Sequence, residues 1–380
     1  MADGSEQPAN TSAVPIRGGL VKAEYYWRDH QQWLQERGYL LRPRYRPDWV
    51  PSWQGTKKHY LDCEDGLMIE HPYIIDATRL SDDTLVSLKK VSTDIHSFEA
   101  DIGRYLCSEE LRNDSDNHCV TFYEVLQDPL DEHVVILVMP LLRECDDPNF
   151  ETVGEVIGFI QQLISGMRFM HVHHVAHRDI MLPNIMLDPK PMFPDMYHPL
   201  CTNKKRNFTG TAKHYSRTER PTKYYYVDFG LSRKYNPENG PPLELPILGG
   251  DKTVPEFQDE GYDKAVNPFP TDIYYLGNLI RMAFLQVSRD AAEIRYQNFQ
   301  FLHTLVTDMV QDDPQKRPPI EEVASQFTEA TSKLSSRVLR SRLRRINEPA
   351  IFRFFLGLGH LIRTAKYVVK RLPPVPTPST

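Results

Sequence analysis

Three side chains with hard oxygen atoms, Asp179, Asn184 and Asp228, stand in two short segments of the chain. The first segment is HVAHRDIMLPNIMLD (174–188), and the second is YYYVDFGLSR (224–233). A carboxylate such as that of Asp179 can align a hydroxyl group and take its proton. The oxygens of Asn184 and Asp228 suit Mg²⁺ beside nucleotide phosphates. This set of residues would serve the transfer of a phosphoryl group.

Both segments resemble signatures of the protein kinase superfamily. The first has the form H-R-D-x-x-x-x-N, from His177 to Asn184, and the second contains D-F-G, starting at Asp228. Either tripeptide alone occurs by chance, but both in this order behind an apolar helix are specific. The resemblance implies that Asp179 is the catalytic base, that Asn184 and Asp228 hold Mg²⁺, and that ATP is the phosphate donor.

Three later motifs follow in the order that the family has. V-P-E, ending at Glu256, resembles the A-P-E element, and D-I-Y-Y-L-G, starting at Asp272, resembles the helix start that braces the catalytic loop. Arg317 stands where kinases place the arginine that pairs with the A-P-E glutamate, here Glu256. The resemblance covers roughly residues 60–330. Together with RPRYRPDWVPSW (42–53), it is similar to a fungal branch of kinase-like proteins.

A lysine in the first part of the chain completes the resemblance. V-S-L-K, ending at Lys89, resembles the V-A-I-K strand, so Lys89 would contact the α- and β-phosphates of ATP. Its partner in the family is a glutamate on the next helix. We choose Glu99, because Ile102 and Leu106 follow at helical spacing and would turn it inward. Two other acidic residues are poorer alternatives, namely Asp101 and Glu109.

The resemblance also implies where the nucleotide binds. It places a hinge between two lobes near Met139–Leu142, and it assigns ATP binding to Met139 and Leu141 together with Lys89. The expected catalytic residues are Asp179, Lys89, Glu99 and Asn184.

Four features depart from the family pattern. No glycine occurs in residues 68–101, where a glycine-rich loop should let backbone amides approach the phosphates. Met181 stands where Ser/Thr kinases usually have a lysine, and Gly249 stands where the threonine partner of that lysine belongs. The segment before Asp228 is longer than in the family. Its excess, 189–223, has eight Lys/Arg against two acids and predicts a basic surface loop.

Hydrophobic periodicity predicts strands early in the chain and helices later. Strands are expected at 73–80, 84–91 and 134–139, and helices at 20–40, 152–173, 271–288, 297–311 and 319–335. The Pro- and Trp-rich segment 42–53 is expected to be an extended wrapping segment. This order predicts an α+β protein, and with the resemblance a bilobal protein-kinase-like fold with a β-rich N-lobe and a helical C-lobe.

The expected domain organisation has four parts. Residues 1–55 form a disordered start and an N-terminal extension, 56–140 the N-lobe, 141–330 the C-lobe with the basic insertion 189–223, and 331–380 a basic amphipathic tail.

Composition and charge narrow the functional class. In 380 residues, 40% are hydrophobic, and the five scattered cysteines form no CxxC pair, which argues against a zinc finger or a disulfide scaffold. Neither a secretory signal nor an apolar run long enough for a membrane span is present, which predicts an intracellular, most simply cytoplasmic, protein. The net charge of −6 combines an acidic body with a basic tail, which argues against nucleic-acid binding by the body.

The basic tail contains a second amphipathic pattern. Apolar residues recur at helical spacing through 350–371, while Arg353, His360, Arg363 and Lys370 lie on the other face. The simpler interpretation is a helix docked on the acidic body of the protein. The alternative is a peripheral contact with an anionic membrane.

Three functions are consistent with these motifs. The first is a protein kinase that transfers the γ-phosphate of ATP to a protein hydroxyl, with serine or threonine favoured by family base rates alone. The second is a pseudokinase scaffold that binds partners without catalysis, which the missing glycine-rich loop, Met181 and Gly249 favour. The third is phosphorylation of a small molecule by the same fold.

Overall fold

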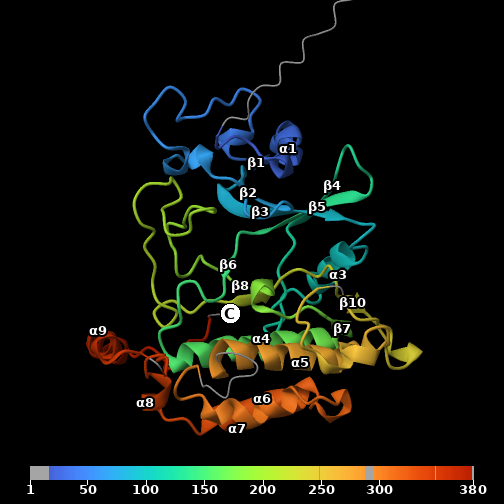
Figure 1. Cartoon of the computed structure of the whole chain (residues 1–380), viewed down its shortest axis with the longest axis vertical. Coiled ribbons are helices and arrows are strands. Elements are labelled where there is room, and N and C mark those ends of the chain that lie inside the picture. The colour runs from blue at the N-terminus through green and yellow to red at the C-terminus, as the bar shows by residue number, and fades with distance from the viewer. Residues whose placement is uncertain (1–16, 248, 287–294, 347, 379–380) are drawn as a thin grey trace, which may run out of the picture. The chain divides into compact units, whose positions relative to one another are not determined.

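The computed structural model describes residues 17–247, 249–286, 295–346 and 348–378, and it has a mixed α+β architecture (Figure 1). The α+β class predicted from the order of apolar patterns is confirmed. Contacts along the chain define two compact units. One runs to Leu88 and includes Pro199–Cys201, and the other contains Lys89–His198 and the residues from Thr202 onward.

The first unit begins with two short helices and a strand pair. Helices α1 (Lys22–Asp29) and α2 (Gln31–Glu36) replace the single helix expected at 20–40, and they bury Trp27 and Leu34 completely. Strand β1 (Tyr39–Leu40) then pairs antiparallel with β2 (Ile74–Arg79). The apolar faces of the two helices explain why this short segment folds, because isolated helices of this length are marginal in water.

The connection between β1 and β2 corrects one expectation. Residues 42–53 are not extended; they begin with a 3₁₀ turn at Pro43–Tyr45 and continue through further turns. Arg44 is fully buried here, 3.0 Å from the carboxylate of Glu24, and it donates to the carbonyl oxygens of Asp65 and Leu67. A buried guanidinium needs several acceptors at once, and a folded loop supplies them where an extended chain cannot.

Strand β3 (Thr84–Ser92) crosses the division between the units, which falls between Leu88 and Lys89. The second unit continues with α3 (Glu99–Leu106) and the antiparallel strands β4 (Glu124–Gln127) and β5 (Val134–Pro140). The five strands follow the order β1-β2-β3-β5-β4. The predicted strands at 73–80, 84–91 and 134–139 are thus present, whereas β4 was not expected from the sequence.

The chain between β5 and the helices that follow β10 contributes the strands of two small sheets. Strands β6 (Arg143–Glu144), β8 (Ile185–Leu187) and β9 (Tyr224–Tyr226) form one, in the order β6-β8-β9. Strands β7 (Val175–Ala176) and β10 (Arg233–Lys234) form the other. The pairing of β8 with β9 brings the chain after residue 184 beside the chain before residue 228, so distant sequence segments become neighbours.

Helices supply most of the core of the second unit. Helix α4 (Val153–Val172) is buried on nearly all sides and contacts α7 (Ile320–Ser332), while α5 (Pro268–Ile280) contacts α6 (His303–Met309) (Figure 1). Thr152 caps α4 by accepting from the amide of Glu155 at 3.1 Å. The helices α5 and α6 are shorter than the helices expected at 271–288 and 297–311. Helix α5 ends at Ile280 and continues as a π-helical turn to Leu285, and α6 begins only at His303, after a 3₁₀ turn.

The insertion 189–223 is folded around its own small core of Met192, Phe193, Tyr197 and Ala212. One of its basic residues, Arg217, is buried and donates to the carbonyl oxygen of Cys145 and to the hydroxyl of Tyr224. The expected basic surface loop is therefore partly a packed element. Helices α8 (Ser336–Leu339) and α9 (Ala350–Val369) follow α7. Within the described part of the chain, every helix is too short or too polar to cross a membrane.

Candidate functional site

An ion-pair cluster, mostly buried at Lys89 and Glu99 and partly exposed at Asp228, centres on Lys89. Its Nζ atom lies 2.5 Å from Oε1 of Glu99 and 2.9 Å from Oδ1 of Asp228. Lys89 is on β3, Glu99 opens α3, and Asp228 follows β9, so three separate elements meet at one ammonium group. Glu99 is buried with Ile102 and Leu106 on one face of α3, as the helical spacing predicted.

The charges of this cluster stabilise each other. Burial raises the pKa of Asp228, but the charge and hydrogen bond of Lys89 outweigh it and hold that pKa below its usual value. Burial lowers the pKa of Lys89, yet the attraction of Glu99 and Asp228 is larger in sum and raises it. These shifts favour the charged forms of Lys89 and Asp228, whereas burial raises the pKa of Glu99 in spite of the lysine beside it. A lysine held in this way presents a fixed positive charge to an anionic ligand.

Asp179 and Asn184 form a second group. The side-chain amide of Asn184 donates to the backbone oxygen of Asp179 at 2.8 Å and to its Oδ2 atom at 2.8 Å. The 3₁₀ turn Leu182–Asn184, which has a proline near its start, bends the chain back and makes these bonds local. The amide thus fixes the orientation of the Asp179 carboxylate.

Backbone contacts bring this group close to Asp228. The amide of Val227 donates to the backbone oxygen of Asn184 at 3.0 Å, and a ring nitrogen of His177 lies 3.2 Å from the backbone oxygen of Val227. Asp228 itself has a positive φ of 64° and accepts from the amide of Gly230 at 3.2 Å. These contacts place the three oxygen-bearing side chains on adjoining pieces of backbone.

Asp272, in the first turns of α5, holds the loop that contains His177 and Arg178 through its buried carboxylate. It accepts from the amide of His177 at 2.8 Å and from the amide of Arg178 at 2.7 Å. Arg178 has a positive φ of 69°, so these two bonds help to hold a backbone conformation that residues other than glycine rarely adopt. This is the bracing role that the motif starting at Asp272 predicted.

One oxygen of Asp179 is enclosed by a glycine. Among the described residues its Oδ1 atom is buried without a hydrogen-bond partner. Gly250 has a φ of +71°, and a Cβ atom at this position would lie 2.4 Å from that oxygen. Burial raises the pKa of Asp179, against the opposing effects of His177 and Asn184. The backbone at Gly250 therefore covers one side of the candidate base in this conformation.

Two oxygen donors are available for a divalent cation. The side chain of Asp228 is 46% exposed, and Asn184, at the end of the 3₁₀ turn before β8, carries a side-chain amide oxygen. A carboxylate and an amide oxygen fit the hard character of Mg²⁺, which keeps several waters of its own. Groups of three or more His, Cys, Asp and Glu that could hold a metal do not occur in the described ranges, but the predicted pair is of a different kind.

The residues that depart from the family pattern differ in how closely they are packed. Met181 is half-buried, and a Cβ atom at Gly249 would meet nothing within 4 Å. Gly66, a glycine close to the expected phosphate loop, is explained by packing, because a Cβ atom there would lie 2.0 Å from the backbone oxygen of Tyr60. Met139 lies near the end of β5 and Leu141 directly after it; both are half-buried, and their assignment to ATP stays a prediction.

Two contacts were not foreseen from the sequence. A ring nitrogen of His96 lies 3.2 Å from the backbone oxygen of Gly230, and the hydroxyl of Ser232 donates to the backbone oxygen of His177 at 3.0 Å. Both tie the chain after Asp228 to other elements. A lone histidine or serine in a loop carries no sequence signal for such a bond.

A comparison with models of known protein families finds no match, and a comparison with curated proteins finds none either. The assignment of a function therefore depends on the geometry of the site and on the motifs.

Proposed function

We propose that the chain has a bilobal protein-kinase fold and transfers the γ-phosphate of ATP to a protein hydroxyl, with serine or threonine as the favoured acceptor. The observation that carries this proposal is the meeting of Lys89 with Glu99 and Asp228 at 2.5 and 2.9 Å. Lys89 and Glu99 are ten residues apart, whereas Asp228 is far from both in the sequence. Their convergence at one ammonium group is what phosphate positioning requires and is not needed for a packed core.

Each residue has a distinct role in this proposal. Lys89, held by Glu99, orients the α- and β-phosphates of the nucleotide. Mg²⁺, held by Asn184 and Asp228, would neutralise the phosphate charge. Asp179, oriented by the amide of Asn184 at 2.8 Å, accepts the proton of the attacking hydroxyl. The raised pKa of Asp179 makes it a better proton acceptor than an ordinary aspartate.

A pseudokinase scaffold is the second candidate, and one observation favours it. The backbone at Gly250 encloses one oxygen of Asp179, so a substrate hydroxyl reaches that atom only after the chain near Gly250 moves. The absence of glycine from residues 68–101 and the side chain of Met181 point the same way. A scaffold would keep the Lys89 cluster for nucleotide binding or for structure, and it would not use Asp179.

Binding of ATP to the purified chain tests the nucleotide site. Unfolding is followed by thermal shift with ATP, with and without Mg²⁺, beside an Asp228→Ala variant. A ligand at 100 times its dissociation constant stabilises the fold by about 2.7 kcal/mol. We expect a Mg²⁺-dependent shift that the variant loses, after its own melting temperature without nucleotide has been recorded. Absence of a shift at millimolar ATP would contradict a working nucleotide site.

Phosphate transfer then separates the enzyme from the scaffold. We expect the intact chain to transfer labelled phosphate from ATP to a generic protein substrate or to itself. Asp179→Asn should abolish transfer and keep the thermal shift, because it removes the proton acceptor and leaves the lysine cluster intact. A chain that binds ATP and transfers no phosphate, with Asp179→Asn indistinguishable in every assay, would establish the scaffold instead.

A further inference from the structure

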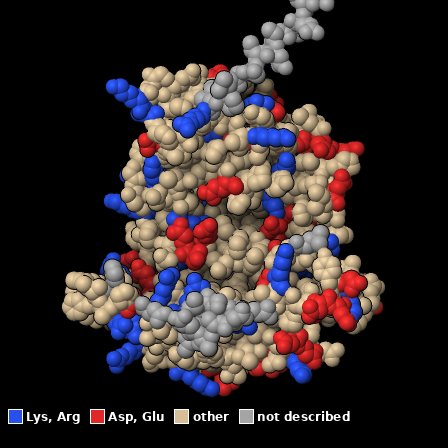
Figure 2. Space-filling view, in the orientation of Figure 1, with Lys and Arg blue, Asp and Glu red and all other residues tan. Residues whose placement is uncertain are grey.

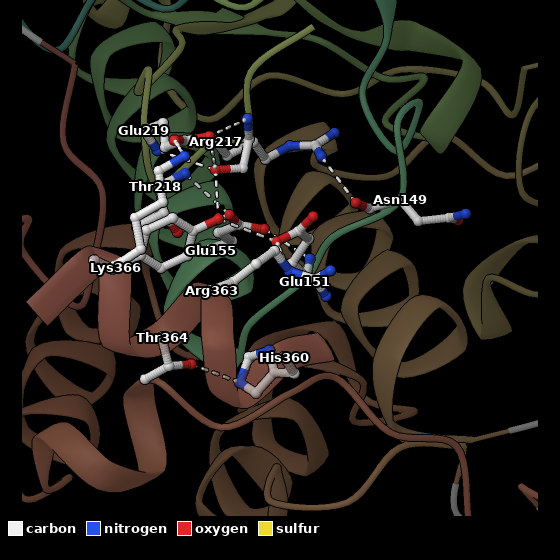
Figure 3. A network of polar contacts seen from close by, with 12 residues as sticks. Asn149, Glu151, Glu155, Arg217, Thr218, Glu219, His360, Arg363, Thr364 and Lys366 are labelled. Atoms are coloured by element: carbon white, nitrogen blue, oxygen red, sulfur yellow. Dashed lines mark hydrogen bonds and ion pairs between the residues drawn. The ribbon is translucent and has the colours of Figure 1, made fainter. Parts of the chain in front are cut away.

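Helix α9 packs on the rest of the second unit through its polar face. Arg363 and Lys366 point from the helix toward Glu151 and Glu219 (Figure 3), at nitrogen–oxygen distances of 3.2 and 2.6 Å. Between them Tyr367, only 2% exposed, shares a hydrogen bond of 2.8 Å with the hydroxyl of Ser216. These contacts anchor the helix in one rotation about its axis.

The opposite face of α9 is apolar and turned to the solvent. Six side chains on it have exposed fractions between 52% and 68%: Ile351, Phe354, Phe355, Leu358, Leu361 and Ile362. We call them the α9 stripe. They recur at helical spacing, so they form one continuous band along the helix. In Figure 2 the surface at the place of α9 is a protrusion without charged residues on its outer side.

This orientation is the reverse of the usual one. A surface helix in a water-soluble protein turns its apolar side chains to the core and its charged side chains outward. Contiguous exposed apolar surface marks a site where something else binds. The contacts of Arg363, Lys366 and Tyr367 prevent the helix from rotating its stripe inward. Another molecule must therefore bind the stripe if its apolar side chains are to leave water.

The charge around the stripe indicates what that cover is. Residues 333–371 contain eleven Lys/Arg and one acid, and α9 itself contains no Asp or Glu. The two exposed arginines Arg345 and Arg371 form no ion pair among the described residues, and Arg353 is exposed on α9. A second copy of the chain would bring the same positive charge to the contact and would repel it. An anionic surface is complementary.

The shape of the stripe favours a lipid surface over an acidic protein. A helix of 20 residues is about 30 Å long, and the stripe runs along its solvent-exposed side. A protein partner would need a matching groove of that length, whereas a membrane interface accepts any convex apolar helix that lies flat. The helix is not apolar enough along its length to cross a bilayer. We propose that α9 binds flat in the headgroup region of an anionic membrane, with the α9 stripe among the acyl chains.

Sedimentation with vesicles tests this proposal. The full chain is mixed with vesicles of phosphatidylcholine alone or of phosphatidylcholine with phosphatidylserine. We expect binding to the mixed vesicles to be about tenfold or more stronger, and to weaken as the salt concentration rises. A Phe354→Ser, Phe355→Ser, Ile362→Ser variant should bind about tenfold or more weakly, because three apolar side chains no longer leave water.

A matched control carries three serines at other exposed apolar positions, Val50→Ser, Ile95→Ser and Leu130→Ser, whose side chains are at least 70% exposed. It should bind the mixed vesicles as the unmodified chain does. Both variants should also melt like the unmodified chain, because all six positions are exposed. A Phe355→Trp variant adds a direct readout, since its fluorescence should shift to the blue on binding the mixed vesicles.

Three outcomes would overturn the proposal. The first is equal binding of the unmodified chain and the stripe variant to the mixed vesicles. The second is equal binding to both kinds of vesicle. The third is no vesicle binding, together with a dimer in sedimentation equilibrium that the stripe variant converts to a monomer, which would assign the stripe to a second copy. None of these outcomes depends on nucleotide binding, so the result is separate from the test of the proposed function.

Discussion

The guanidinium of Arg317 faces the carboxylate of Glu256 in a two-point ion pair, with nitrogen–oxygen distances of 2.7 and 2.6 Å. Both side chains are almost completely buried, and Thr271 also donates to Glu256 at 2.8 Å. Removing one partner strands the other charge in the interior. We expect Arg317→Met or Glu256→Gln to lower the free energy of unfolding by about 3–5 kcal/mol, measured by urea denaturation.

A control for this prediction is the exposed pair Lys333–Glu329, whose side chains are both 70% exposed. Lys333→Ala should change the free energy of unfolding far less than Arg317→Met does, because exposed i,i+4 pairs contribute little. Equal effects of Lys333→Ala and Arg317→Met would contradict the assignment of a structural role to the buried pair.

The Lys89–Asp228 contact predicts how stability changes with pH. The folded pKa of Asp228 is below its unfolded value of about 3.9, so its stabilising contribution is complete above that value. It is lost as the pH falls through the lower folded pKa. The stability difference between the unmodified chain and Asp228→Asn should therefore be constant near neutral pH and should shrink below about pH 4.

Lys89→Met supplies the comparison for the pH series. Burial then raises the pKa of Asp228 without the opposing lysine, so we expect the chain to become less stable as the pH rises through that raised value. Urea denaturation at a series of pH values measures both effects. A Lys89→Met chain whose stability varies with pH as that of the unmodified chain does would show that Lys89 does not control this carboxylate.

Gly250 gives a third prediction because two costs meet at this residue. Alanine is strained at a φ of +71°, and its Cβ atom would also lie 2.4 Å from the Oδ1 atom of Asp179. Gly210 has a φ of +56° with nothing within 4 Å, so Gly210→Ala measures the backbone cost alone, about 1–2 kcal/mol. Gly250→Ala should destabilise the chain by more than Gly210→Ala.

A double variant tests the cause of the excess. Adding Asp179→Ala to Gly250→Ala removes the close oxygen, so the two substitutions should cost less together than the sum of their separate effects. Additive effects in chemical denaturation would show that Gly250 does not press on Asp179.

Tyr367 is expected to be the main anchor of helix α9. Truncating a buried aromatic side chain costs about 3–5 kcal/mol locally, whereas loss of the half-exposed Lys366 ammonium from its pair with Glu219 costs about 1 kcal/mol or less. Amide hydrogen exchange within 350–369 should accelerate strongly in Tyr367→Ala and little in Lys366→Ala. Similar exchange rates in the two variants would refute the dominance of Tyr367.

Local patterns in the sequence were sufficient to predict several strands, the inward face of one helix and one buried ion pair. The spacing of Ile102 and Leu106 after Glu99 predicted the inward face of α3, because side chains three and seven residues apart share one side of a helix. The motif order predicted that Arg317 would meet Glu256, and the pair is present. The strands at β2, β3 and β5 followed from apolar, β-branched runs.

Other features depended on contacts between distant residues. The burial of Arg44 against Glu24 turned an expected extended segment into a folded loop, and the basic insertion acquired a core of its own. The cover that Gly250 makes over Asp179 needs two segments that no local pattern relates.

The tail shows most clearly which features of the structure the sequence alone does not determine. Its alternation of apolar and basic residues by itself determined an amphipathic helix, since periodicity depends only on the geometry of one element. Which face would point inward was decided by the tertiary structure, where Glu151 and Glu219 capture Arg363 and Lys366, and Tyr367 is buried between them. Ion pairs and one buried ring selected the polar face for docking, and the apolar face remained outside.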